Sequence, residues 1–419
     1  RQIKQQLNEM GEKAKAASAV LNTAPSVQKN SFFDFAIKEI KSDQELILMA
    51  NHQDVAQARD AGKDAAFIDR LELNQDRLEG ICATLEEIKL FPDPVGKILA
   101  NWDRPNGLNI SRVSTPLGVI GIIFESRPNV ASDAGGLCLK SGNAVILRSG
   151  KDGLRSASAL VTAMQKALLK AGLPKESIQI VPSENREAAT LMLEGLNGSI
   201  DVIVPRGGKS LVAEVEKSAK VPVFGHLEGI CHVYVDEHAD LKKAREICIN
   251  AKMRRSGICG AAETILLHQK IATSFGPDLI TKLSSLNCEV RGCKKTLSLD
   301  RYVIPATEED WSTEYLAPII SIKVVDDAEE AIQHINSYGT GHTESIISED
   351  LNSQNQFTAS IDSAIVMINT STQFADGGEF GLGGEIGIAT GKFHARGPVG
   401  LDQLTSFKYI VSGDGQIRL

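Results

Sequence analysis

One cysteine stands in a setting that could make its thiol a nucleophile. Cys259 lies in the segment SGICGAAETILLH, between a predicted helix and a predicted strand, with Gly257 and Gly260 close on either side. Glycines let a substrate approach the backbone closely and allow a strained, exposed turn. Arg254 and Arg255 add positive charge, which favours a thiolate. A buried, inert thiol is the alternative for this residue.

A glutamate and a histidine follow a short apolar run in the segment FGHLEGICH. Glu228 could act as a general base, or it could cap a helix or form an ion pair. The neighbouring Cys231 and His232 suggest a metal site, but consecutive residues of a strand point to opposite faces of the sheet. We therefore expect no metal ion, and no CxxC motif occurs elsewhere in the chain.

Cations and glycines follow two predicted strands. Arg148, Ser149 and Lys151 end the segment SGNAVILRSGK, and Gly207 and Gly208 lie in PRGGKS, which opens a predicted helix. The carboxyl ends of parallel strands bind ligands in α/β sheets, and helix N-termini bind anions. These residues could hold a phosphate group, with a solvated strand end and an ordinary turn as the alternatives.

A side-chain amide follows a third predicted strand, which ends at Phe124. Asn129 comes directly after Arg127 and Pro128 in the segment ESRPN. An amide at such a strand end can donate a hydrogen bond to an oxyanion, or it can form a turn.

The elements that must position these residues are those of an α/β protein. Residues 2–100 have helical spacing of their apolar residues up to a break near residues 91–94. Short apolar runs then alternate with helical stretches, which predicts two successive α/β regions with parallel sheets. The predicted strands are 119–124, 144–147, 178–181, 200–204, 222–224, 232–235, 264–268, 319–325, 365–369 and 406–411, and the predicted helices after residue 100 are 153–171, 184–196, 239–253 and 277–285.

Length and composition limit the class of protein. The 419 residues predict two or three domains, and 42% hydrophobic with 23% charged residues excludes a disordered or fibrous chain. No apolar run is long enough to span a membrane, and a net charge of −8 argues against a dominant nucleic-acid surface. Seven cysteines without metal or disulfide spacing, and no apolar leader segment, favour a reducing cytoplasm.

Taken in order, these segments resemble the aldehyde dehydrogenase superfamily. The resemblance runs from about residue 115 to 412 and includes HLEGICHVYVD, the Cys259 segment, EYLAPIISIKVV and the glycine-rich GGEFGLGGEIGIATG. The stretches ESRPN, YGTGHTESI and HARGPVGL are similar to those of the branch that reduces an acyl phosphate.

The resemblance implies an architecture. We expect an α/β fold with a Rossmann-type cofactor domain, a second α/β catalytic domain and a small oligomerisation strand region. Residues 1–227 would form the NADP-binding domain, with a return segment at about 366–399, and residues 228–365 would form the catalytic domain. Residues 400–419 would be an oligomerisation tail that supports a homodimer or homotetramer.

The resemblance also implies a reaction. It is the NADPH-dependent reduction of L-glutamyl 5-phosphate to L-glutamate 5-semialdehyde and phosphate, the second step of proline biosynthesis from glutamate. Cys259 would attack the acyl phosphate and form a thioester, and Asn129 with the Cys259 backbone amide would bind the oxyanion. Glu314 would hold the nicotinamide ribose. Lys151 and Arg148 would attract the 2′-phosphate of NADPH.

The resemblance also implies the cofactor and substrate residues and a partner. Arg148, Ser149, Lys151, Gly207, Gly208 and Glu314 form the expected cofactor set. Glu228 is kept as a proton-transfer group, and Arg127 and His342 are expected to contact the substrate. A functional association with glutamate 5-kinase is expected from the substrate, which that enzyme produces.

Of three other interpretations, the first two remain open and the third is disfavoured. The first is a hydrolytic NAD(P)-dependent aldehyde dehydrogenase that acts on a small semialdehyde and needs an activated water. The second is a catalytically silent protein built on the same fold. The third is a bifunctional synthase, which would need an amino-terminal kinase; the first 115 residues are too short for one and lack a phosphate-binding loop.

Overall fold

The computed structural model describes all 419 residues, which fold into two compact units. The first unit contains Arg1–Gly225, Gly381–Gly387 and Val399–Leu419, and the second contains His226–Phe380 and Ile388–Pro398. This division corrects the expected return segment at 366–399. Most of that segment belongs to the second unit, because its strands pair there, and only residues 381–387 and 399 return to the first.

A four-stranded parallel sheet forms the centre of the first unit, in the order β5-β4-β3-β6. All six residues of β3 are buried, as the continuous apolar run predicts for a strand covered on both faces. The strands are β3 (Val119–Phe124), β4 (Ala144–Ser149), β5 (Ile178–Ile180) and β6 (Val202–Arg206). The predicted strand at 222–224 is wrong, because only an isolated bridge joins Val223 to Ile203.

Helices cover both faces of this sheet. Helices α6 and α7 pack on one face with α2, α3 and α5 beyond them, whereas α1 and α8 contact each other and α1 lies against β3, β4 and β5. The predicted helical region and its break after Leu90 are confirmed. The helices are α1 (Gln2–Leu21), α2 (Ser26–Ser42), α3 (Gln44–Asp60), α4 (Ala65–Leu71), α5 (Gln75–Leu90), α6 (Asn129–Lys140), α7 (Leu154–Lys170), α8 (Arg186–Leu193) and α9 (Lys209–Ser218).

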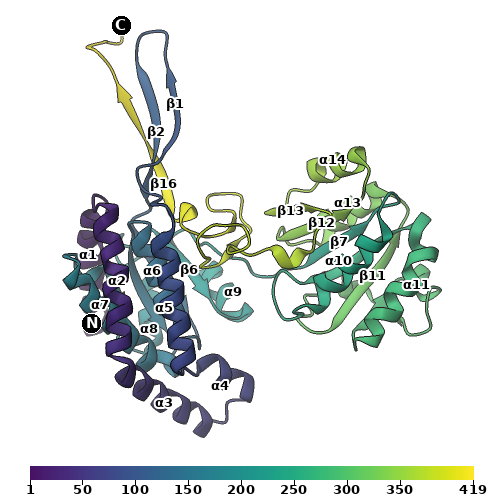
Figure 1. The fold of residues 1–419 in the computed structure, drawn as a ribbon, viewed down its shortest axis with the longest axis horizontal. Coiled ribbons are helices and arrows are strands. Elements are labelled where there is room, and N and C mark those ends of the chain that lie inside the picture. The colour runs from purple at the N-terminus through teal and green to yellow at the C-terminus, as the bar shows by residue number, and fades with distance from the viewer. The chain divides into compact units, whose positions relative to one another are not determined.

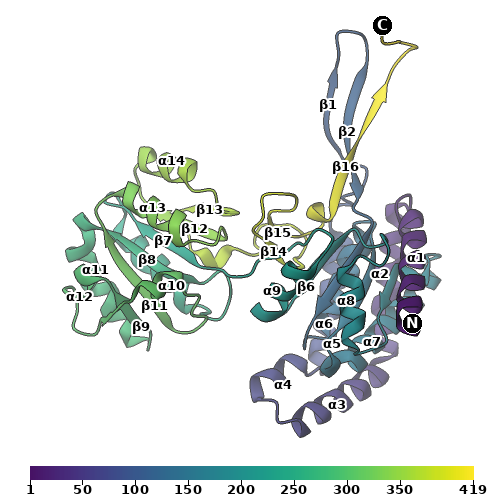
Figure 2. The same ribbon diagram turned by 180° about the vertical axis from the view of Figure 1, so that it is seen from behind.

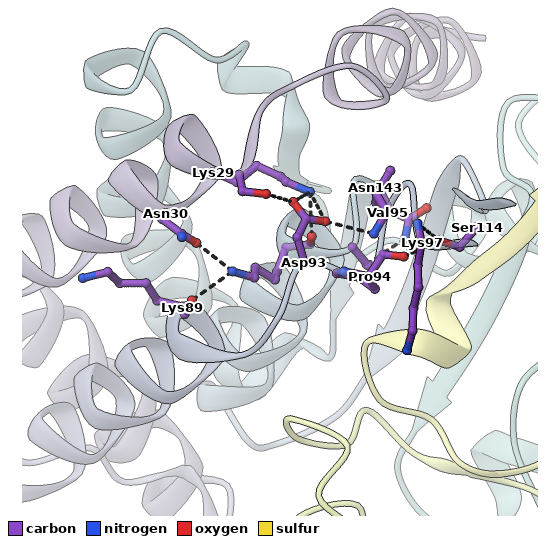
Figure 3. A network of polar contacts seen from close by, with 12 residues as sticks. Lys29, Asn30, Lys89, Asp93, Pro94, Val95, Lys97, Ser114 and Asn143 are labelled. Atoms are coloured by element: carbon purple, nitrogen blue, oxygen red, sulfur yellow. Dashed lines mark hydrogen bonds and ion pairs between the residues drawn. The ribbon is translucent and has the colours of Figure 1, made fainter. Parts of the chain in front are cut away.

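A buried polar network joins the helical layer to the loop after α5 (Figure 3). The Lys29 ammonium is 1% exposed; it pairs with Asp93 at 2.8 Å and donates to the Lys140 carbonyl. The Lys140 ammonium donates in turn to Asn30 and to the Lys89 carbonyl. Burial raises the pKa of Asp93, but hydrogen bonds from Lys29 and Ser26 outweigh that effect and hold the pKa below its usual value. The network therefore holds the loop after α5, which carries Asp93, against α2 and the end of α6.

A three-stranded antiparallel sheet extends from the first unit (Figures 1 and 2). Its strands are β1 (Ile98–Asp103), β2 (Asn109–Pro116) and β16 (Thr405–Ser412), in the order β1-β2-β16. The prediction of a strand at 406–411 is confirmed. The β1–β2 hairpin was not predicted, because the exposed β1 has no buried alternating face that would mark it as a strand.

The second unit is built on a seven-stranded parallel sheet in the order β10-β9-β11-β8-β7-β12-β13. The predicted strands at 232–235, 264–268, 319–325 and 365–369 are confirmed, whereas β9, β10 and β12 were not predicted. The strands are β7 (Cys231–Val235), β8 (Ala262–His268), β9 (Glu289–Gly292), β10 (Ile304–Pro305), β11 (Ile319–Val325), β12 (Thr343–Ile347) and β13 (Ile365–Ile368). A short pair, β14 (Ile388–Ala389) and β15 (Gly397–Pro398), lies outside the sheet.

Two apolar clusters, one for each helix pair, pack against this sheet. One joins Val233 and Ile265 to α10 and α11, and the other joins Tyr234 and Leu266 to α13 and α14. Successive residues of a strand therefore enter different clusters, as the period of two requires. The helices are α10 (Leu241–Met253), α11 (Gln269–Ser285), α12 (Lys294–Leu297), α13 (Ala328–Tyr338) and α14 (Leu351–Ser360). Helix α11 begins eight residues before the predicted start at Pro277 and includes that proline.

No helix in the structure has the length and apolar character needed to cross a bilayer.

Candidate active site

Burial divides the seven cysteines, all of which are free thiols. Cys259 and Cys293 are partly exposed, and the other five are buried. Burial raises the pKa of each of the five buried thiols, which are Cys82, Cys138, Cys231, Cys248 and Cys288. Cys293 lies beside Thr296, with Sγ 3.2 Å from the threonine hydroxyl. Cys259 is thus the partly exposed thiol in the predicted turn, which is confirmed between α10 and β8.

Three loops of the second unit meet at one edge of its sheet. Residues 226–230 precede β7, Cys259 precedes β8, and residues 340–342 precede β12. These strands are neighbours in the order β8-β7-β12 and run parallel, so their amino ends lie at the same edge. The structure therefore brings Cys259, Glu228 and His342 to the amino edge of this sheet.

The loop before β7 touches the backbone of the turn that carries Cys259. A Cβ placed on Gly229 would lie 2.3 Å from the Cys259 carbonyl oxygen, so a side chain cannot fit without displacing the turn. The Cys231 thiol donates to the same carbonyl at 3.2 Å. The Gly229 amide donates to Glu314 Oε2 at 2.7 Å, which ties the predicted ribose-binding glutamate to this loop.

A buried ion pair fixes the segment after Glu314. The Lys252 ammonium lies 2.5 Å from the Glu263 carboxylate, and both side chains are at most 1% exposed. Glu263 also accepts hydrogen bonds from the backbone amides of Tyr315 and the residue after it. Burial raises the pKa of Glu263 to about 7, and Lys252 opposes that rise. Because charges buried this way are costly unless fully paired, the pair holds the Glu314 segment in one position.

Two histidines lie beside Cys259. One ligand atom each from His226, Cys259 and His342 lies within 4.8 Å of the others. His226 Nδ1 lies 2.8 Å from the Ile388 carbonyl, and His342 Nδ1 lies 2.7 Å from the Thr343 hydroxyl. Burial, and secondarily the charge of His226, lowers the pKa of His342 to about 3. The three side chains could exchange protons or hold a metal ion. This set differs from the Cys231–His232 pair suggested by the sequence.

Arg148 and Ser149 end strand β4 in the first unit, and Lys151 follows in a short 3-10 helix. Lys151 is exposed. Arg148 donates to the Glu184 carbonyl at 3.3 Å, and burial followed by the nearby charge of Arg186 lowers its pKa. The Ser149 hydroxyl is buried and donates to the next carbonyl. This strand end therefore presents two cationic side chains, Arg148 and Lys151, to an anion, whereas the Ser149 hydroxyl already donates its hydrogen bond to a backbone carbonyl.

The two predicted glycines lie at the N-terminus of α9. Gly207 and Gly208 follow β6, and the Gly208 amide donates to Glu125 Oε2 at 3.3 Å. A cavity of about 510 Å³ opens here, between the carboxyl ends of β3 and β6. The chain moves from β3 to one side of the sheet and later returns to β6 on the other, and α/β sheets bind ligands at such points. The residues that line it are Phe67, Arg70, Glu125, Ser126, Arg127, Val130, Arg206, Gly207 and Gly208.

A second cavity, of about 550 Å³, shares Arg70 and Arg127 with the first. Asn129 lies on its wall, in the first turn of α6, and donates to Asp133 at 3.1 Å. Partial burial lowers the pKa of Arg127, and the charges of Arg206 and Arg70 lower it further. Guanidinium groups that repel one another in this way would be stabilised by an anion.

The predicted site residues thus fall into two sets, one in each unit. The second unit gathers Cys259, Glu228, Glu314 and His342. The first unit gathers Arg127, Asn129, Gly207 and Gly208 around two cavities, with Arg148, Ser149 and Lys151 at the end of the neighbouring strand. The sequence did not single out Arg70, Asp133 or the contact role of Gly229. Arg206 is part of the segment PRGGKS and is the last residue of β6, and this position at a strand end could have marked it as a ligand-binding residue.

Comparison with known proteins identifies the family of this chain. The model of the aldehyde dehydrogenase family matches residues 2–295 and 303–410. The chain belongs to the aldehyde dehydrogenase family. Members of this family use nicotinamide cofactors. The predicted resemblance and the α/β fold of two sheet-based units are therefore confirmed.

Individual relatives place the chain within one branch of the family. It is 56% identical to a gamma-glutamyl phosphate reductase of Brucella suis, over 99% of both chains. It is similar to the crystal structure of gamma-glutamyl phosphate reductase from Thermotoga maritima, with 44% identity, a TM-score of 0.96 and coverage of 99% of this chain and 100% of that one. An engineered glycolyl-CoA reductase with bound NADP+ shares the fold at 18% identity and a TM-score of 0.66, over 96% of each chain.

Proposed function

We propose that this chain catalyses the NADPH-dependent reduction of L-glutamyl 5-phosphate to L-glutamate 5-semialdehyde and phosphate, which makes it a glutamate-5-semialdehyde dehydrogenase of proline biosynthesis. The observation that carries the proposal is the partly exposed Cys259 thiol, which lies at the same sheet edge as Glu228 and His342. The relatives named gamma-glutamyl phosphate reductase, which match almost the whole chain, supply the substrate.

The Cys259 thiolate begins the reaction by attacking the acyl carbon of the substrate. A carbon–sulfur bond forms, the carbon–oxygen bond to phosphate breaks, and phosphate leaves with that electron pair. The resulting thioester is a better hydride acceptor than a carboxylate, which is why two easier steps replace one difficult step. NADPH, when bound, supplies the hydride that reduces the thioester to the aldehyde level. Cys259 then leaves as a thiolate and the semialdehyde is released.

Negative charge develops on the substrate oxygen in both stages. We assign its stabilisation to the Cys259 backbone amide and the Asn129 side chain, since preorganised donors at such a position lower the barrier. Asp133 accepts a hydrogen bond from Asn129, which orients that amide. His342 is completely buried, so we assign it to the surroundings of the Cys259 thiol rather than to direct substrate contact.

The residues at the strand ends of the first unit fit a phosphate-bearing cofactor. The α9 N-terminus with Gly207 and Gly208 suits a pyrophosphate. The Gly208 amide, which now donates a hydrogen bond to the Glu125 carboxylate, would donate to the pyrophosphate instead. Arg148 and Ser149 end strand β4, and Lys151 follows it; the two cations would attract a 2′-phosphate and favour NADPH over NADH. Glu314 is assigned to the nicotinamide ribose.

The second cavity suits the amino-acid end of the substrate. Its wall carries the guanidinium groups of Arg70 and Arg127 together with the carboxylates of Asp76 and Asp133. A zwitterion with one carboxylate and one ammonium group matches such mixed charge. We assign the substrate α-carboxylate to Arg127.

Glu228 is assigned to proton transfer rather than to water activation. The hydrolytic alternative needs a water to attack the thioester, whereas the reductive reaction needs water to be excluded. Because an acyl phosphate hydrolyses readily, we also propose a functional association with glutamate 5-kinase, which supplies it. Seven free thiols favour a reducing compartment, and we propose the cytoplasm.

The reaction run in reverse provides the test. Purified protein is given glutamate 5-semialdehyde, phosphate and NADP+, and NADPH absorbance is followed. We expect phosphate-dependent NADPH formation, and we expect Cys259→Ser to lower the rate about a thousandfold or more because the nucleophile is lost. Cys293→Ser, which alters the other partly exposed thiol, should keep the activity. Turnover that does not depend on phosphate would favour the hydrolytic aldehyde dehydrogenase instead.

A further inference from the structure

We propose that His226, Cys259 and His342 form a binding site for a zinc-type divalent cation, and that occupation of this site blocks the nucleophile. The proposed reduction needs no metal ion, so the site would regulate the enzyme rather than take part in its chemistry. All three residues belong to the second unit.

The first argument is the geometry of the three donors. One nitrogen of each imidazole and the Cys259 sulfur lie within 4.8 Å of one another, and the two rings are nearly perpendicular with centroids 4.9 Å apart. Zinc binds nitrogen and sulfur ligands at about 2.0–2.3 Å in a tetrahedral arrangement, so neighbouring ligands lie about 3.5 Å apart. Small side-chain shifts would bring these donors to that spacing. Water would complete the fourth position.

The second argument is a buried nitrogen without a partner. The His342 side chain is 0% exposed, and its Nε2 has no hydrogen-bond partner. Its Nδ1 contacts the Thr343 hydroxyl at 2.7 Å. When Nδ1 carries the proton and donates a hydrogen bond to the Thr343 hydroxyl, Nε2 keeps a lone pair that can bind a cation. Buried polar atoms usually find a partner, and here a metal ion would provide it.

The third argument is the support behind the ligands. Histidines that bind metals donate their second nitrogen to a carbonyl or another acceptor, which fixes the ring and the tautomer. His226 has such a partner in the Ile388 carbonyl, 2.8 Å from Nδ1. The Cys231 thiol donates to the Cys259 carbonyl at 3.2 Å and holds the turn that carries the third ligand. Hydrogen bonds outside the proposed metal site therefore fix the orientation of His226 and the turn that carries Cys259.

The donor set also selects the kind of cation. A thiolate and two imidazoles suit zinc and related ions, whereas magnesium and calcium prefer oxygen ligands. When the cation binds, a metal–sulfur bond forms and any proton on the Cys259 sulfur is released to solvent. The sulfur lone pair is then unavailable for attack on the substrate, and a chelator restores it by removing the cation.

The test uses the full chain without substrate or cofactor, so it does not depend on the proposed reaction. Chelator-treated protein is titrated with Zn²⁺ by calorimetry and with Co²⁺ by absorbance, because a Co²⁺–thiolate bond gives a charge-transfer band. We expect one ion per chain and a thiolate band that Cys259→Ser removes and Cys293→Ser keeps. We also expect Zn²⁺, but not Mg²⁺, to slow iodoacetamide labelling of Cys259 about tenfold or more, as measured by mass spectrometry.

The histidines are tested by replacements that keep a polar side chain. We expect His226→Gln and His342→Gln each to weaken Zn²⁺ binding about tenfold or more, because each removes a ligand. His238→Gln, on an exposed histidine of the same unit, should change nothing. Equal Zn²⁺ affinity in both ligand variants would overturn the proposal, as would a thiolate band in Cys259→Ser or undiminished labelling of Cys259 in the wild type.

Discussion

At the scale of single residues, burial decides which side chains can react. Burial raises the pKa of five cysteines, and two thiols stay partly exposed. Cys259 lies in the turn between α10 and β8, and Cys293 lies between β9 and α12 beside Thr296. The cations follow the same logic. Burial lowers the pKa of Arg127, the charges of Arg206 and Arg70 lower it further, and an anion would relieve that repulsion.

Arg127→Leu should lower the activity with aldehydes that carry a carboxylate more than the activity with aldehydes that lack one. A charged hydrogen bond contributes about 1.5–3 kcal/mol, so we expect kcat/KM to fall about 10- to 100-fold for glutamate 5-semialdehyde and for 5-oxopentanoate. Activity with 4-aminobutanal and butanal, which lack the carboxylate, should change little. Steady-state rates with phosphate and NADP+ give the four ratios. Arg59→Leu, on the exposed end of α3, is the matched control; an equal loss with all four aldehydes would contradict the assignment.

Lys151→Glu should change the choice of cofactor. A carboxylate in place of this exposed ammonium would repel the 2′-phosphate of NADPH and leave NADH, which lacks that phosphate, unaffected. We expect the ratio of kcat/KM for NADP+ to that for NAD+ to fall about tenfold or more. Lys175→Glu, at another exposed lysine of the first unit, serves as control. An unchanged ratio would place the 2′-phosphate elsewhere.

At the scale of elements, the two sheets use opposite ends. In the first unit the residues proposed to bind anions lie at the ends of β3, β4 and β6 or directly after them, at the carboxyl edge of the sheet. In the second unit the proposed nucleophile and its neighbours precede β7, β8 and β12, so they lie at the amino edge. The proposed sites therefore follow the carboxyl-end rule in the first unit and depart from it in the second.

Gly229→Ala should disturb the turn that carries Cys259. The added methyl group would lie 2.3 Å from a backbone oxygen, which cannot rotate away as a side chain can. We expect the free energy of unfolding of the second unit to fall by about 1–3 kcal/mol, together with a loss of activity. Gly257→Ala is the control, because its nearest neighbour would be 3.8 Å away. Denaturant unfolding measures both; equal stability of the two variants would show that the turn adapts.

At the scale of the whole chain, the extended antiparallel sheet has an open edge. Strand β16 pairs with β2 on one side only, and Phe407, Tyr409, Ile410 and Val411 are each 46–58% exposed. Unpaired strand edges with exposed apolar side chains promote pairing with another chain. This observation supports the expected homo-oligomer, which stays a prediction.

Lysines on β16 should weaken self-association. We expect the wild type to have a mass in solution that is a multiple of 45.1 kDa, and Tyr409→Lys combined with Val411→Lys to shift it toward a single chain. Light scattering after size-exclusion chromatography measures the mass. Leu169→Lys, at a 61% exposed position on α7, controls for the change in charge. A monomeric wild type would contradict the prediction.

The sequence by itself determined the features that depend on neighbouring residues. Helical periodicity marked residues 2–90, apolar runs marked the buried strands, and two glycines marked the turn around Cys259, because these patterns arise within a few residues. The exposed β1–β2 hairpin and the short β12 gave no such pattern. The family resemblance supplied the reaction, which local patterns do not contain.

Only the tertiary structure decided which distant segments meet. The order of parallel strands is set by long-range packing, so no local pattern showed that β7, β8 and β12 are neighbours or that their amino ends form one edge. That order brings His226 and His342 to Cys259 and leaves no room for a side chain at Gly229 beside it. In the first unit, packing of α4 brings Arg70 to the same cavities as Arg127. Residues far apart in the chain acquire a shared site only when the folded core places them together.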